Sequence, residues 1–388
     1  MRSICLTLSL VLFGGTNASA NVFDIFEDLQ PVNSFLPDCV PSMNLGCDTC
    51  YTDSTCENSC YGCPPAPLMI GDSMGIPYHV QDGAGRLNLP NFYSKVADNN
   101  SAIPQDRVFL TYQYFNDYRL QNIFGGPNSK RDLQLYTVGL EKTFGGGNLS
   151  AELIVPFSYS PSPQFVWGAG IAPASQMELQ DVAFGLKALL YQNDASAVST
   201  GVRLEVPTAA DIHAVNIAGV LHNDVWAITP YLALLHNLTD DTFLQAFAAY
   251  RMRTTDQWVT SAGAPFQVGR EPNYLNLDAQ LGHWLYRNHG SSGLTGLMAS
   301  VELHYTGTFE PVSPQGITGA SVYLEGEQDI LNLTTGITAL FNDNATLTVG
   351  VVRPVRNGST TLPGVIDAPS DRFYDWEAVI QFNYFFGN

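Results

Sequence analysis

The stretch at residues 297–306 decides the fold, and it reads Leu297-Met298-Ala299-Ser300-Val301-Glu302-Leu303-His304-Tyr305-Thr306. Its odd-numbered positions are apolar, whereas its even-numbered positions from Ser300 onward are polar or charged. Because successive side chains of a β-strand point to opposite faces, this alternation predicts a strand with one apolar and one polar face. A slip of one residue would move Glu302 and His304 to the apolar face, so the register is well specified.

Eleven similar stretches accompany this one between Asp106 and Phe386, and the gaps between the twelve alternate in length. The short gaps are rich in Gly, Asn, Asp or Ser, as tight turns are, and they lie at 145–148, 192–195, 237–240, 288–293 and 342–344. The long gaps lie near 119–131, 159–177, 208–222, 255–272, 310–326 and 357–372. This pattern predicts an all-β fold, a transmembrane antiparallel up-and-down β-barrel of about twelve strands with short periplasmic turns and long outer loops.

The composition agrees with a barrel that faces lipid on one side and water on the other. Charged residues make up only 14% of the chain, the mean hydropathy is near zero, and the net charge is −19. This acidity argues against nucleic acid as a partner. We therefore expect outer-membrane lipid to surround the protein.

The two ends of the chain carry targeting features. Residues 1–20 have a basic start at Arg2, an apolar run at 4–13 and an Ala18-Ser19-Ala20 site, and they predict a cleaved signal peptide. The last stretch alternates apolar and polar residues and resembles the C-terminal strand that the barrel-assembly machinery binds. It departs from that pattern because it ends Phe386-Gly387-Asn388. We expect the machinery to be a partner and the outer membrane of a Gram-negative-type cell to be the location.

Six cysteines remain after removal of the signal peptide, and they crowd into 25 residues: Cys39, Cys47, Cys50, Cys56, Cys60 and Cys63. An even number in a secreted chain predicts three disulfides, although the two C-x-x-C pairs leave a metal site or a redox role open. The sequence does not select among the possible pairings.

Four segments follow from these features: the signal peptide at 1–20, a Cys-rich periplasmic head at 21–66, a linker or partial plug at 67–105, and the barrel at 106–388. Apolar residues at helical spacing within 22–29 predict a short helix. That helix packs on the head or reaches into the lumen as a plug.

The polar faces of the predicted strands carry thirteen ionisable residues, eight acidic, four basic and one histidine. These lumen-lining candidates are Glu141, Glu152, Asp181, Lys187, Arg203, Glu205, Arg251, Arg253, Asp278, Glu302, His304, Asp375 and Glu377. They form either a ladder of ion pairs that braces the wall or an acidic lumen that favours cations and neutral solutes, and the two are compatible.

Two neighbouring stretches resemble a known family. They read Glu178-Leu-Gln-Asp-Val-Ala-Phe-Gly-Leu-Lys187 and Val202-Arg-Leu-Glu-Val-Pro-Thr208. Together with the strand pair through Tyr250 and the lead-in at 95–109, they resemble the outer-membrane barrels named for the meta-pathway of phenol degradation, with fatty-acid and hydrocarbon channels as distant relatives. The match covers about 75 of 388 residues, and Ala209 stands where the family has Gly. The resemblance implies passive uptake of small apolar or aromatic compounds.

These features favour a channel or transporter for small solutes, with a structural or adhesive surface protein as the alternative. None of the seven histidines lies in the His-Ser-Asn-Gly sequence of outer-membrane phospholipases, and Asp–His pairs of the protease type fit only loosely. We therefore expect no enzyme activity, no cofactor and no metal.

Overall fold

A computed structural model describes residues 65–82, 85–120, 129–159, 177–210, 212–214, 219–254, 258–261, 264–267, 273–288, 292–308, 315–317, 320–322, 329–356 and 374–386. The chain forms two compact units, Met1–Val40 and Pro41–Asn388, and every described residue belongs to the second. The predicted signal peptide, the predicted helix at 22–29 and all six cysteines of the head lie outside the described residues.

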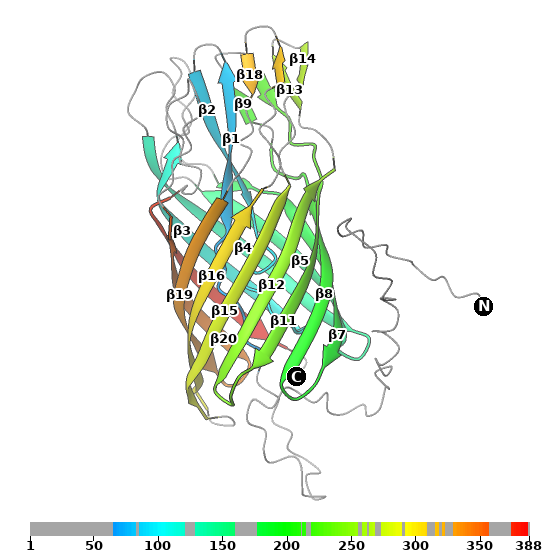
Figure 1. Ribbon diagram of the computed structural model, residues 1–388, viewed down its shortest axis with the longest axis vertical. Helices are drawn as coiled ribbons and strands as arrows, with labels where there is room; N and C mark the ends of the chain where they lie inside the picture. The colour runs from blue at the N-terminus through cyan, green and yellow to red at the C-terminus, as the bar shows by residue number, and fades with distance from the viewer. Residues whose placement is uncertain are drawn as a thin grey trace, which may run out of the picture. The chain divides into compact units, whose positions relative to one another are not determined.

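Twelve antiparallel strands form a closed barrel, as the sequence predicts (Figure 1). In order they are β3 (Arg107–Leu120), β4 (Ser129–Phe144), β5 (Leu149–Tyr159), β7 (Val182–Gln192), β8 (Ser196–Val206), β11 (Ala227–Asn237), β12 (Thr242–Arg253), β15 (Tyr274–Arg287), β16 (Leu294–Gly307), β19 (Asp329–Phe341), β20 (Ala345–Pro354) and β21 (Trp376–Phe385). Each strand pairs with the next along the chain, and β21 pairs back onto β3 from Trp376↔Asn116 to Phe385↔Arg107. Closure leaves the barrel without an open edge.

Burial alternates along the strands, so one face of the wall is mostly buried and the other is more exposed. On β16, Glu302 and His304 are buried while Val301 and Leu303 are exposed. The alternation predicted at 297–306 is therefore confirmed. Strand β11 is apolar on both faces, and its sequence leaves the orientation open; the structure buries its odd-numbered residues and exposes Pro230.

The outer face of the barrel carries an apolar band bordered by aromatic residues. Its exposed residues include many Leu, Val, Ile and Phe side chains. Phe144, Tyr191 and Tyr384 are exposed close to the short turns, whereas Trp226 and Tyr250 are exposed at the opposite ends of their strands. An apolar belt with two aromatic borders is the surface of a barrel that spans a membrane.

Two of the short turns predicted from the sequence have the backbone angles that their residue types favour. Gly145, Gly146 and Gly147 all have positive φ, and so do Asn342 and Asp343. Such angles suit Gly and Asn and are the angles that tight hairpins require. Among the described residues, no helix is long and apolar enough to cross a membrane.

Two legs of chain, residues 65–73 and 94–106, run inside the barrel, and together they are called the lumenal segment here. Between them, β1 (Met74–Asp82) and β2 (Gly85–Tyr93) form a hairpin. At one end of the lumenal segment the Gln105 side chain donates to Ala66 O, next to the start of β3 and therefore at the short-turn end of the barrel.

Two small sheets form from the hairpin and the long loops. The first has the order β17 (Gln315–Ile317), β18 (Ala320–Val322), β1 and β2, and the second has β14 (Ala264–Gln267), β13 (Trp258–Ser261), β10 (Gly219–Leu221) and β9 (Ile212–Ala214). A short strand, β6 (Met177–Leu179), pairs with the outer end of β5. The hairpin thus joins the lumenal segment to the loop between β16 and β19 (Figure 1).

Candidate functional site

The barrel interior is the candidate site, because it brings the chain's buried charges together around the lumenal segment. The clearest contact is between Glu302 and the backbone of the first leg. The amide N–H of Ile70 donates to Glu302 Oε1 at 2.7 Å, and that of Gly71 donates to Glu302 Oε2 at 2.8 Å. Gln280 and His304 also contact this carboxylate, at 2.7 and 3.1 Å. One buried wall carboxylate therefore binds two successive amides of a leg that has no strand partner.

Wall side chains also satisfy other backbone groups of the first leg. Gln280 donates to Leu68 O at 3.1 Å, Gln381 to Ile70 O at 2.6 Å, and Thr334 to Gly71 O at 3.2 Å. Buried backbone groups need partners, and here inward Gln and Thr residues of β15, β21 and β19 supply them.

The second leg is held in the same way from the opposite side of the barrel. Arg107 Nη1 donates to Asn99 O at 2.7 Å, and Arg203 Nη1 donates to Lys95 O at 2.7 Å. Gln245 Oε1 accepts the amide N–H of Ala102 at 3.1 Å. Polar bonds to both sides of the wall therefore set the position of the lumenal segment.

Asp98 connects the two legs to each other. Its carboxylate accepts the amide N–H of Asp72 at 3.1 Å, the Ser73 hydroxyl at 2.6 Å and the amide N–H of Lys95 at 2.7 Å. Gly71 makes this approach possible, because its φ is +88° and a Cβ there would lie 2.2 Å from Asp98 Oδ1. Burial, with a further contribution from Asp72, raises the pKa of Asp98 to about 6.

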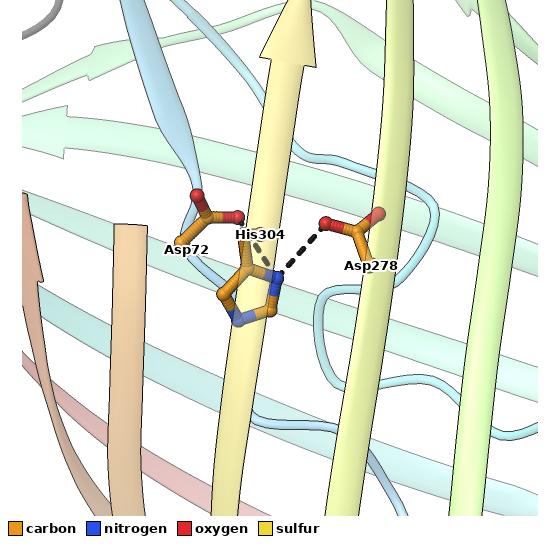
Figure 2. Close-up of side chains that lie close together, drawn as sticks. All are labelled: Asp72, Asp278 and His304. Atoms are coloured by element: carbon orange, nitrogen blue, oxygen red, sulfur yellow. Dashed lines mark hydrogen bonds and ion pairs between the residues drawn. The ribbon is translucent and has the colours of Figure 1, made fainter. Parts of the chain in front are cut away.

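A second group of charges lies where the first leg meets β15 and β16. Figure 2 shows Asp72 and Asp278 on either side of His304. His304 Nδ1 lies 2.9 Å from Asp278 Oδ1 and 3.4 Å from Asp72 Oδ1, and all three residues are buried. Lys95 Nζ is 2.7 Å from Asp72 Oδ1 and 3.7 Å from Asp278 Oδ1.

These groups bear on whether the site could hold a metal ion. The ligand atoms of Asp72, Asp278 and His304 lie within 4.8 Å of one another. However, the ammonium group of Lys95 already supplies positive charge between the two carboxylates, and His304 Nδ1 faces Asp278 directly. The geometry is that of an ion-pair network, and we assign no metal to it.

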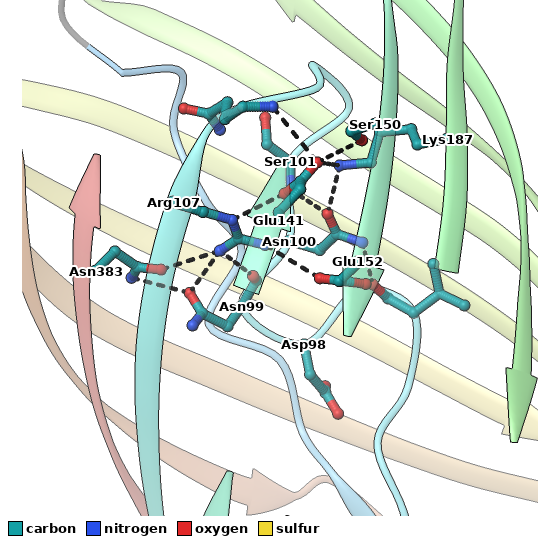
Figure 3. A network of polar contacts seen from close by, with 12 residues as sticks. Asp98, Asn99, Asn100, Ser101, Arg107, Glu141, Ser150, Glu152, Lys187 and Asn383 are labelled. Atoms are coloured by element: carbon teal, nitrogen blue, oxygen red, sulfur yellow. Dashed lines mark hydrogen bonds and ion pairs between the residues drawn. The ribbon is translucent and has the colours of Figure 1, made fainter. Parts of the chain in front are cut away.

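The facing part of the wall carries a third group in which bases and acids are matched (Figure 3). Arg107 Nε lies 2.9 Å from Glu141, and Lys187 Nζ lies 3.0 Å from the same carboxylate. Arg203 Nη2 is 3.1 Å from Glu152. Because both partners of each pair belong to the wall, these charges stay compensated whether or not the lumenal segment is present.

Two further carboxylates lie on the wall in different surroundings. Glu205 receives three hydrogen bonds from Arg251, of 2.7–3.1 Å. Glu377 is fully buried on β21 and accepts a hydrogen bond from Gln113 at 2.8 Å. The Oδ2 of Asp278, by contrast, has no hydrogen-bond partner among the described residues.

Eleven of the thirteen lumen-lining candidates lie on barrel strands, and they are buried or nearly so. They are Glu141, Glu152, Lys187, Arg203, Glu205, Arg251, Arg253, Asp278, Glu302, His304 and Glu377. The other two lie just beyond strand ends: Asp181 accepts the amide N–H groups of Thr208 and Ala209, and Asp375 is half-buried before β21. Asp181 thus connects the two stretches on which the family resemblance depends.

Four charges that lie in the interior, Arg107, Asp72, Lys95 and Asp98, were not among the residues predicted from the sequence. Arg107 has the same odd-numbered parity as Thr111 and Gln113, so the alternation along β3 places its side chain on the same inner face. The other three lie on the lumenal segment, where no strand periodicity marks which residues are buried.

The interior is not uniformly acidic. Bases of β3, β7, β8 and β12 face one side of the lumenal segment, whereas Asp278, Glu302 and Glu377 lie on β15, β16 and β21 on the other side, where His304 is the only buried wall base among the described residues. An apolar zone fills the barrel toward the short turns, where Met69 packs with Phe243 and Trp284.

Comparisons with known proteins add solved structures only, since no protein-family model and no curated protein matches the chain. The chain is similar to an outer membrane channel, COG4313, from Pseudomonas putida F1, at 12% identity and a TM-score of 0.47, over 76% of this chain and 100% of that one. A Pseudomonas aeruginosa FadL homologue matches at 12% identity and 0.40, over 81% and 100%. The KdgM porin in complex with disordered oligogalacturonate matches at 10% and 0.36, over 72% and 99%.

These scores carry no functional argument, and the class of the protein rests on its own surface and closure. In a closed antiparallel barrel, neighbouring strands satisfy one another's backbone N–H and C=O groups. The apolar exterior with its aromatic borders suits the hydrocarbon of a membrane. The protein is an outer-membrane β-barrel.

Proposed function

We propose that the protein is a channel or transporter for the passive passage of small solutes, and that the lumenal segment closes it in the state described here. The observation that carries this proposal is the polar attachment of the lumenal segment. Ile70, Gly71 and Lys95 are held by wall carboxylates, amides and guanidinium groups rather than by apolar packing alone.

Polar attachment suits a segment that leaves and returns. When it leaves, water can hydrate the exposed Gln, Asn, Glu and Arg side chains of the wall, so much of the lost bonding is recovered. An apolar interior would have no such compensation and would favour permanent closure.

The solute class follows from two parts of the interior. The aromatic side chains in the apolar zone, Tyr231, Phe243, Phe247 and Trp284, support the small apolar or aromatic compounds that the family resemblance implies. The carboxylates of β15, β16 and β21 support a lumen that is acidic on one side. Catalysis has less support, because both ring nitrogens of His304 contact carboxylates and neither contacts a nucleophile among the described residues.

The remaining partners and the position of the head are proposals of the same kind. The lumenal segment starts at the short-turn end of the barrel, which supports a periplasmic head before it. The apolar outer face of β21 supports binding by the barrel-assembly machinery, and the apolar belt supports outer-membrane lipid as the surroundings.

A structural or adhesive surface protein is the second candidate. The small sheet of β17, β18, β1 and β2 favours it, because pairing between the hairpin and an outer loop would brace an exposed surface. In that case the lumenal segment would be a permanent core.

Conductance in planar bilayers separates the two candidates. The wild type is compared with Gly350→Ala, since a Cβ at Gly350 would lie 2.9 Å from Ile70 Cγ2 and push against the first leg. We expect rare openings in the wild type and frequent openings in the variant. Absence of conductance in both, with barrel structure retained by circular dichroism, would refute the channel and favour the structural protein.

A further inference from the structure

We propose that the acidic wall around Asp278 and Glu302 is a binding site for a primary ammonium group, and that Lys95 occupies the Asp278 side of this site when the lumenal segment is docked. The inference rests on the proposed function for its role in transport, since it names a small organic cation as the solute that replaces the lumenal segment. The binding site itself is argued from the docked contacts.

The docked segment supplies positive charge and N–H donors to this wall. Lys95 Nζ lies 3.7 Å from Asp278 Oδ1, and its closest partner, Asp72, is 2.7 Å away on the other leg. The backbone amides of Ile70 and Gly71 donate hydrogen bonds to the two oxygens of the Glu302 carboxylate. Because Lys95, Asp72 and both amides belong to the lumenal segment, all of them leave the wall together.

The wall that remains keeps fewer donors than its carboxylate oxygens can accept, because only Gln280 and His304 of the described wall residues still contact Glu302 and Asp278. Asp278 and Glu302 both contact His304, the wall base of this group, so the carboxylates outnumber it two to one. Even in the docked state, Asp278 Oδ2 has no hydrogen-bond partner among the described residues. A buried carboxylate oxygen without a partner is costly, so this part of the wall favours an incoming cation that carries donors.

The carboxylates on the opposite part of the wall are already compensated by wall bases and do not require an incoming cation. Glu141 and Glu152 keep their wall partners Arg107, Lys187 and Arg203 after the lumenal segment leaves. A cation is therefore attracted to one side of the lumen, the side formed by β15, β16 and β21.

A primary ammonium fits these acceptors better than a metal ion does. It carries three N–H donors on one charge, which matches a set of carboxylate oxygens that already accept N–H groups. The lysine side chain shows that a group of this size is accommodated, with Lys95 fully buried at the site. His304 instead directs both ring nitrogens at carboxylates, as in a structural network.

Chemical rescue tests the site without depending on conductance. Lys95→Ala removes the ammonium group, and hydrogen–deuterium exchange of peptides from 65–73 and 94–106 reports how firmly the lumenal segment is docked. We expect exchange to speed up by roughly tenfold or more, because a buried charge network loses one partner. Propylammonium chloride at tens of millimolar should reverse most of this change, whereas equal concentrations of sodium chloride or propanol should not.

Two matched variants test the specificity of the rescue. Lys95→Ala combined with Asp278→Asn should lose most of the rescue, because a wall carboxylate of the site is gone. Lys142→Ala makes the same substitution at an exposed lysine outside the lumen. Because Lys142 pairs with Asp106 at the end of the second leg, this control is compared on peptides from 65–73, where it should change neither the exchange nor its response to propylammonium. Equal rescue by sodium, or rescue that persists without Asp278, would overturn the proposal.

The wild type provides an independent measurement if Lys95→Ala does not assemble. There propylammonium competes with the lumenal segment, so it should accelerate exchange of 65–73 as its concentration rises, and Asp278→Asn should weaken that response. An unchanged exchange rate at all concentrations would refute the ammonium site. The proposed channel fails separately, through absence of conductance in both the wild type and Gly350→Ala.

Discussion

Replacing Glu302 by Gln should release the lumenal segment more than any neutral substitution on the same wall. The carboxylate accepts the amide N–H groups of Ile70 and Gly71 at 2.7 and 2.8 Å. Glutamine has nearly the same shape but keeps a single acceptor oxygen. Its NH₂ group then faces one of the two amides, donor against donor.

The magnitude follows from the two bonds. Hydrogen bonds to a charged group contribute about 1.5–3 kcal/mol each. Glu302→Gln loses one bond and weakens the other, so we expect docking to lose about 2–4 kcal/mol, which corresponds to a roughly 30- to 900-fold larger undocked population. Burial of the carboxylate at 0% exposure means that solvent does not screen this loss.

Hydrogen–deuterium exchange of residues 65–73 in detergent measures the undocked population. Thr334→Val is the matched control, because it removes a neutral hydrogen bond of 3.2 Å to Gly71 O on the same leg, and about 1 kcal/mol predicts a roughly fivefold effect. An effect of Glu302→Gln no larger than that of Thr334→Val would refute the role of the carboxylate in docking.

Four further predictions follow from the topology, the head and the lumenal segment. Protease added to whole cells should cleave within 255–272 and spare the turn at 342–344, and cleavage at the turn in intact cells would contradict the strand count. Intact mass with and without reduction before alkylation should show six adducts between Cys39 and Cys63 only after reduction; bound zinc with free thiols would show a metal site instead. Burial raises the pKa of Asp98 from about 3.8 to about 6. Its contribution to docking is therefore fully present below about pH 3.8 and is lost as the pH rises through 6, by up to roughly 3 kcal/mol. Exchange of the lumenal segment should slow from pH 8 to pH 5, and Asp98→Asn should flatten this dependence. Gly71→Ala places a Cβ at φ +88° against Asp98 and should speed exchange of both legs at every pH, whereas unaltered exchange would show that the legs do not meet there.

The barrel itself could be predicted because its physics is local. Alternation of period two fixes which residues of β16 face outward, and Gly or Asn at 145–147 and 342–344 permits the positive φ of tight turns. Strand count, register and inward parity all follow from such nearest-neighbour patterns. Glu302 and His304 were identifiable in this way before any coordinates were known.

Contacts between distant residues could not be predicted in the same way. Residues 67–105 carry no periodicity, so the sequence leaves open whether they form a linker or lie in the lumen. Strand β11 is apolar on both faces, and only its pairing with β8 and β12 decides that Tyr231 points inward.

The partners of the interior charges show the same division. The sequence by itself determines that Asp278, Glu302 and Lys187 lie on polar strand faces, because that property depends on each strand alone. Only the tertiary structure decides that Lys187 neutralises Glu141 while Glu302 binds the backbone of a segment more than 230 positions away. The reason is physical: side-chain parity is set by the local backbone, whereas ion pairing depends on which strands and which leg of the lumenal segment the closed barrel brings within a few ångströms.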